Sequence, residues 1–134
     1  MVALIFVDSN VWIFLNMENY PEHPMSREKI NYLRTEGIAT NLVVVSEVFH
    51  KLSLLLDRSR ALVRLTKMLD SANVSYIPTE AHTARKAVRL SAMTRLRIND
   101  AIIAEQALAI GAGVLTDNVK DFRKVRGLKV IPLR

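Results

Sequence analysis

The chain alternates short apolar runs with longer segments whose apolar residues recur at helical spacing. Residues 2–7 are all apolar, which predicts a first strand covered on both faces. Four further β-rich runs predict strands at 38–41, 74–78, 114–116 and 128–132. Helical patterns cover 10–16, 26–36, 43–56, 58–70, 79–93 and 98–110, with Ser26 and Thr79 as expected N-caps and 17–24 as a polar loop. This alternation is typical of an α/β fold with a mainly parallel sheet of about five strands.

Length and composition favour one globular domain. The 134 residues, without linkers or low-complexity tracts, predict a single domain over 1–134. Apolar residues make up 50% and charged residues 24%, which is typical of a folded core. No apolar run is long enough for a membrane span, and 2–7 is too short for the core of a signal peptide. We therefore expect a cytoplasmic protein without a membrane partner.

The residue inventory narrows the chemistry further. Cysteine is absent, which fits a cytoplasmic location and excludes disulfides, thiolate metal sites and cysteine nucleophiles. Lysine and arginine number 19 against 13 acidic residues, so the formal charge is +6. Such an excess favours a polyanionic partner such as nucleic acid. A basic surface without any partner fits the charge equally well.

Acidic residues stand at the positions where a parallel sheet binds ligands. Asp8 follows the first predicted strand, and Asp117 follows the fourth, with Asp121 close behind. Ligands bind beyond the carboxyl ends of parallel strands, and Glu47, one turn into the helix after the second strand, belongs near that edge. Asp100 begins the last apolar helix, which a simple topology does not bring to the same edge.

Converging carboxylates raise one another's pKa unless a cation joins them. With no cysteine and only three scattered histidines, an all-oxygen site suits Mg²⁺ or Mn²⁺. Such an ion can support hydrolysis of a phosphodiester bond. A basic surface would then bind the nucleic-acid backbone around a local acidic pocket.

Each acid also has an ordinary structural role. Asp8 suits the N-cap of the next helix, and Glu47 and Asp100 suit the first turns of theirs. Asp117 and Asn118 are common turn formers, and Asp121 can cap a turn. The prediction of a metal site depends on the acids being placed together.

Four segments resemble PIN-domain ribonucleases, especially the VapC-type toxins of toxin–antitoxin pairs. They occur in the family's order and at about its spacing, and they span nearly the whole chain: FVDSNVWI at 6–13, VVVSEVFHKL at 43–52, INDAIIAEQALAIGAGVLTDNVKDF at 98–122 and GLKVIPL at 127–133. The third block is the most specific. The resemblance implies a PIN-like three-layer α/β/α sandwich.

The resemblance also implies site residues. Asp8, Glu47 and Asp100 match the three core metal-binding acids, which brings Asp100 to the acidic pocket. The family's fourth acid falls in the segment after the fourth strand, where this chain has Asp117, Asn118 and Asp121. Asn118 stands where many members carry Asp. The remaining members of the expected set are Asp117 and Asp121 as catalytic or metal-binding acids, with Asn10, Thr116 and Asn118 in support.

The implied reaction is Mg²⁺- or Mn²⁺-dependent endonucleolytic cleavage of RNA. Arg95 and Arg97, just before Asp100, are candidates for contacts with the RNA backbone, although they also suit a solvated loop. VapC-type proteins usually form homodimers and are inhibited by a small cognate antitoxin, which would be a separate chain.

Two other functions stay open. A haloacid dehalogenase-type phosphatase also uses a strand-end Asp, but it needs a second Asp two residues later, where this chain has Asn10. A catalytically silent RNA-binding or scaffold protein on the same fold would fit Asn118 if the fourth acid is absent. The acids Asp8, Glu47 and Asp100 argue against that alternative.

Overall fold

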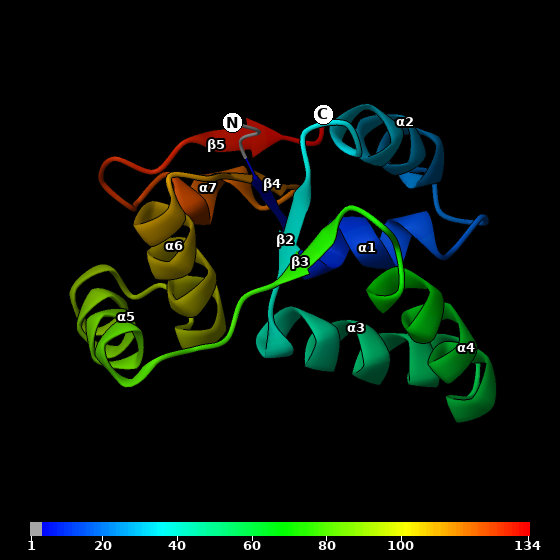
Figure 1. Ribbon diagram of the computed structural model, residues 1–134, viewed down its shortest axis with the longest axis horizontal. Coiled ribbons are helices and arrows are strands. Elements are labelled where there is room, and N and C mark those ends of the chain that lie inside the picture. Colours follow the sequence, from blue (N-terminus) through cyan, green and yellow to red (C-terminus); the bar gives the residue numbers. More distant parts are fainter. Residues whose placement is uncertain (1–3) are drawn as a thin grey trace.

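A computed structural model describes residues 4–134 and shows a five-stranded parallel sheet (Figure 1). The strand order is β3-β2-β1-β4-β5, and every neighbouring pair runs parallel. The strands are β1 (Ile5–Val7), β2 (Ile38–Thr40), β3 (Val74–Tyr76), β4 (Gly113–Thr116) and β5 (Val130–Pro132). The expected parallel sheet of about five strands is confirmed. Of the predicted first strand, residues 2 and 3 lie outside the described part.

Seven helices within residues 4–134 cover the two faces of the sheet and complete a three-layer α/β/α sandwich (Figure 1). One face carries α1 (Ser9–Leu15), α2 (His23–Leu33), α3 (Leu42–Leu55) and α4 (Arg58–Leu69). The other carries α5 (Ala81–Thr94), α6 (Ile98–Ile110) and the short α7 (Val119–Phe122). In this described part of the chain, no helix is both long and apolar enough to cross a bilayer.

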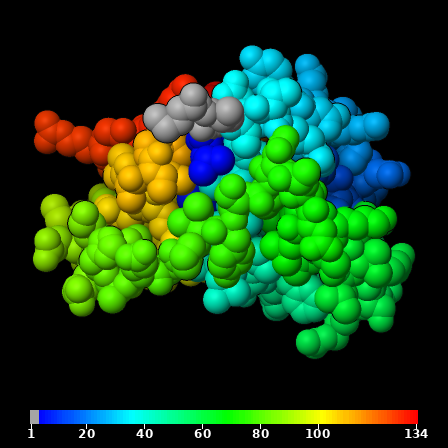
Figure 2. Space-filling model, viewed as in Figure 1, coloured from blue at the N-terminus to red at the C-terminus, as the bar shows by residue number. Residues whose placement is uncertain are grey.

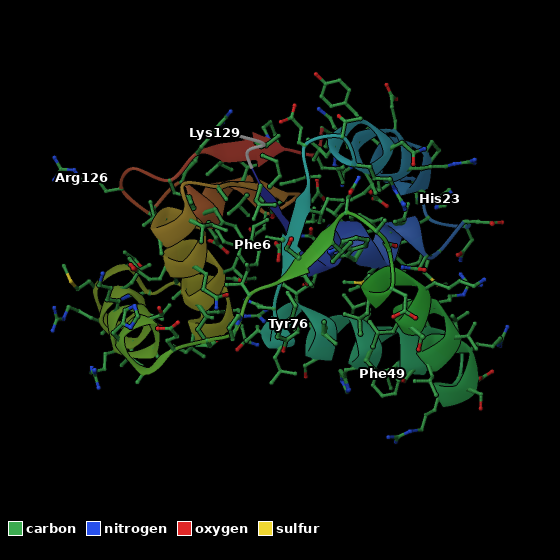
Figure 3. The ribbon with its side chains drawn as sticks, in the orientation of Figure 1. Phe6, His23, Phe49, Tyr76, Arg126 and Lys129 are labelled. Atoms are coloured by element: carbon green, nitrogen blue, oxygen red, sulfur yellow. The ribbon has the colours of Figure 1, made fainter. Side chains whose placement is uncertain are left out.

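The core lies on the three central strands. Every residue of β1, β2 and β4 is buried, and Phe6 lies in the middle of the sheet layer (Figure 3). Burying a side chain of this size contributes about 1.5–3 kcal/mol. The edge strand β3 is more open, and its Tyr76 is 50% exposed. In the filled view, side chains of the helices cover most of the sheet (Figure 2).

Two local predictions were wrong. Ser26 does not cap a helix, because α2 already begins at His23 and Ser26 is buried inside it. Pro24 causes no break there, since proline is tolerated in the first turn of a helix. Thr79 is not a cap either: Glu80 precedes α5, and the Thr79 hydroxyl instead accepts a hydrogen bond from Gln106. The sequence pattern named no helix between the fourth and fifth strands, where residues 119–122 form α7.

The helix α6 brings its first turn to the carboxyl edge of the sheet. Only Gly111 and Ala112 separate its last residue from β4, so α6 ends where β4 begins. Its first residues therefore lie at the opposite edge, beside the first turns of α3 (Figure 1). The sequence alone did not predict that Asp100 lies at the carboxyl edge, because the helix was placed by the edge at which it leads into the fourth strand.

Candidate functional site

Asp8 is a buried carboxylate at the end of β1. Its side chain is 3% exposed, and both of its oxygens accept hydrogen bonds. Oδ1 accepts from the backbone N–H of Ser9 at 2.8 Å, which makes Asp8 the N-cap of α1, and Oδ2 accepts from the Thr116 hydroxyl at 2.7 Å. Burial raises the pKa of Asp8, against the effect of these two donors. Asp8 is therefore both a helix cap and a charge at the site.

Asp100 lies in the first turn of α6 and is 6% exposed. Burial, and then the negative charge of Asp8, raise the pKa of Asp100 to about 6. The nearby Arg97 opposes this rise, whereas Glu47 adds to it. The charge of Glu47 also raises the pKa of Asp8, so the structure brings these three acids into the same neighbourhood.

Glu47 is held by an arginine. Its Oε2 accepts a hydrogen bond from Nη2 of Arg97 at 2.9 Å, and its side chain is 23% exposed. Its second oxygen, Oε1, is buried and has no hydrogen-bond partner within the described residues. Arg97, expected to contact RNA, here forms an ion pair inside the site. Arg95 is the exposed C-cap of α5 with a left-handed φ of 61°, and no ion pair of its side chain is found within residues 4–134.

The acids after β4 are tied to other partners. Both oxygens of Asp117 accept hydrogen bonds from Arg134, each at 2.9 Å. Asp121 accepts a hydrogen bond from the side-chain amide of Asn118 at 2.9 Å, and its charge contributes to the raised pKa of Asp100. Asp121 therefore acts on Asp100, while Asp117 is held by Arg134.

Thr116 and Asn10 support the ends of β1 and β4. The Thr116 hydroxyl donates to Asp8 and accepts from the backbone N–H of Asn118 at 2.8 Å, so one buried side chain links the two strand ends. The Asn10 side chain accepts from the backbone N–H of Asp117 at 3.4 Å. Their supporting role toward a metal site stays a prediction.

The sequence reasoning missed a buried amide pair behind the site. Asn41, the N-cap of α3, accepts from the backbone N–H of Val44 at 2.8 Å and donates to Oε1 of Gln106 at 2.6 Å. Gln106 lies on α6, so the pair joins the helix that carries Glu47 to the helix that carries Asp100. An Asn directly before an apolar helix predicts the cap, but no local signal predicts Gln106 as its partner.

The carboxylate oxygens of the site suit Mg²⁺ or Mn²⁺, although the side chains are too far apart to bind one ion together. Within residues 4–134, no three acidic or histidine side chains are close enough to hold a metal ion as they stand. The orphaned Oε1 of Glu47 and the buried carboxylates of Asp8 and Asp100 are nevertheless acceptors that a hard divalent cation would satisfy. The oxygen atoms of these side chains are therefore suitable ligands for the ion, but in this structure Glu47 is paired with Arg97.

Fold and site together define the class of protein: a three-layer α/β protein with carboxylates at the carboxyl edge of its sheet. The chain belongs to the PIN domain family, whose model matches residues 5–128. A comparison with curated proteins finds no significant match.

Solved structures share the fold at low sequence identity. DNA-bound VapBC from Salmonella typhimurium matches with a TM-score of 0.78 and 19% identity, covering 100% of both chains. The sarcin-ricin loop cleaving toxin VapC20 from Mycobacterium tuberculosis matches with a TM-score of 0.77 and 20% identity, over 96% of this chain and 99% of that one. VapBC2 from Rickettsia felis, bound to a promoter DNA fragment, matches with a TM-score of 0.76 and 18% identity, over 96% and 98% of the two chains.

Proposed function

We propose that the chain is a single-domain, metal-dependent endoribonuclease of the VapC type, acting in the cytoplasm as the toxin of a toxin–antitoxin pair. One observation carries the proposal: on a PIN fold, Asp8 and Asp100 are buried at the ligand-binding edge of the sheet, and the half-buried Glu47 raises the pKa of both. Acids with perturbed pKa values in such a place favour a functional site.

The residues have distinct proposed roles. Asp8, Glu47 and Asp100 would hold Mg²⁺ or Mn²⁺, and the ion would supply positive charge near the scissile phosphate and lower the pKa of water. Thr116 fixes the orientation of the Asp8 carboxylate through its 2.7 Å hydrogen bond. Asp121 would add a further carboxylate to this set, and Asn118 orients it through the hydrogen bond from its side-chain amide. Asp117, paired with Arg134, serves that role less well.

The proposed partners follow from the neighbours and the charge. The Salmonella typhimurium and Rickettsia felis structures are VapBC complexes, which supports a small antitoxin as the partner of this chain. VapC20 is a toxin that cleaves the sarcin-ricin loop, which supports RNA as substrate. The formal charge of +6 suits an RNA backbone, and we place Arg95 among the residues that contact it. We further propose a homodimer.

Cleavage of a labelled RNA in Mn²⁺ tests the activity. Asp8→Asn and Asp100→Asn each remove a charge that the ion needs, so we expect at least a roughly hundredfold loss of rate. Asp70→Asn, which makes the same change at an exposed residue after α4, is the matched control and keeps the wild-type rate. Wild-type cleavage in EDTA would contradict the metal mechanism.

A catalytically silent RNA-binding PIN protein is the second candidate. It is favoured by the spacing of the acids, which form no ready-made metal cluster within residues 4–134. Calorimetric titration with Mn²⁺ separates the two. Binding that is lost in Asp8→Asn and Asp100→Asn supports the nuclease, and absence of binding supports the silent protein. The match to the PIN family leaves no support for the phosphatase alternative.

A further inference from the structure

The side chain of Arg97 places a positive charge among the acidic residues of the site. Arg97 lies directly before α6, and its guanidinium reaches across to Glu47 on α3, 50 residues earlier in the chain. Its positive charge also acts on Asp8 and Asp100. One guanidinium thus pairs with Glu47 and also lowers the pKa of two further carboxylates, in the region where the proposed function requires a divalent ion.

The contact between Arg97 and Glu47 leaves Glu47 half satisfied. Oε2 is paired with Arg97, but Oε1 is buried and has no hydrogen-bond partner among the described residues. A buried acceptor without a partner is costly, so this arrangement favours a further ligand for Glu47. The side chain of Arg97 is 67% exposed, and ion pairs that open to solvent contribute little stability. The pair can therefore open at small cost.

We infer that Arg97 is a built-in counter-ion that competes with the divalent ion for Glu47. The inference rests on the proposed metal-dependent function. With the pair closed, Arg97 balances the acidic edge and occupies Oε2 of Glu47 while Oε1 is buried, so neither oxygen is open to a divalent ion. Binding of the metal requires the pair to open, after which Glu47 faces the ion and the guanidinium returns to solvent. Arg97 is therefore a positioning residue that sets the affinity for metal.

Titration calorimetry with MnCl₂, in the absence of RNA, tests this exchange. Arg97→Gln removes the competing charge and keeps a polar side chain of similar reach. If the open form is about a tenth of the molecules, freeing Glu47 tightens Mn²⁺ binding about tenfold. Arg95→Gln is the matched control: it removes the same charge two residues away, from a side chain without an ion pair within residues 4–134. It leaves the affinity within about twofold of the wild type.

The same substitution in the Glu47→Gln variant separates direct competition for Glu47 from the long-range effect of removing a positive charge. In Glu47→Gln the carboxylate that Arg97 binds is gone, so adding Arg97→Gln changes Mn²⁺ affinity by less than about twofold. Equal tightening by Arg95→Gln and Arg97→Gln, or weaker binding in Arg97→Gln, would overturn the inference and leave the proposed function standing. Absence of Mn²⁺ binding in the wild type and in Arg97→Gln alike would overturn both.

Discussion

Replacing Asp100 by Asn should stabilise the metal-free protein at neutral pH while abolishing its proposed activity. In the folded chain burial raises the pKa of Asp100 from an ordinary 3.8 to about 6, so the folded state holds this proton more tightly than the unfolded state does. The resulting stabilisation is complete below about pH 4 and is lost as the pH rises through 6. The difference between the two pKa values corresponds to about 3 kcal/mol. Asn is neutral at every pH and avoids this loss.

Urea unfolding at pH 4 and pH 7.5, both with EDTA, measures the effect. The stability of Asp100→Asn relative to wild type should rise by about 1–3 kcal/mol between the two pH values, because only the wild type must bury a charge at pH 7.5. Asp70→Asn, at an exposed carboxylate, should follow the wild-type pH profile. A difference between Asp100→Asn and wild type that is the same at both pH values would refute the reasoning.

Three further substitutions test the contacts that support the site and the packing of the sheet that carries it. Thr116→Val removes the hydroxyl that donates to Asp8 at 2.7 Å, so calorimetry should show Mn²⁺ binding weakened about tenfold, with Thr116→Ser restoring it. Asn41→Ala removes the N-cap of α3 and the buried hydrogen bond to Gln106, and should lower the free energy of unfolding by about 2–4 kcal/mol; a loss below 1 kcal/mol in urea would contradict this. Gly113→Ala places a Cβ 3.0 Å from Cδ1 of Ile131 and 3.3 Å from the Lys129 carbonyl oxygen, and should cost about 1–3 kcal/mol in the same assay.

The order of strands and helices was predictable because the buried strands are continuous apolar runs. Residues 5–7 lie in the middle of the sheet, and all of them are apolar, so the pattern of a buried strand is uninterrupted. Helix starts were less predictable where several signals compete. Ser26 has the chemistry of a cap, but the helix begins three residues earlier, and the Ser26 hydroxyl is buried without a partner in the described part. A cap prediction cannot weigh how the preceding residues pack.

The candidate site was predictable as a set of acids but not as a set of contacts. Asp8 follows a strand and Glu47 follows the start of a helix, so topology alone brings them to one edge. Asp100 needed the family resemblance, because the direction of α6 was traced from its wrong end. The pairing of Arg97 with Glu47 depends on side-chain conformations of residues far apart in sequence, and no local pattern encodes it. The sequence also does not predict how the loop between α7 and β5 is placed. In the structure, Arg126 of this loop projects away from the body of the protein (Figure 3).

The pairing of β1 with β4 affects when the site can exist during synthesis. The hydrogen bond from Thr116 to Asp8 joins residues 108 positions apart, and no β-hairpin connects any of the parallel strands. Such long-range pairing forms only after the later strand is available. A ribosome-bound chain that ends before β4 therefore lacks both the neighbour of β1 and the hydroxyl that orients Asp8. The candidate site can therefore form only after β4 has been synthesised and has paired with β1.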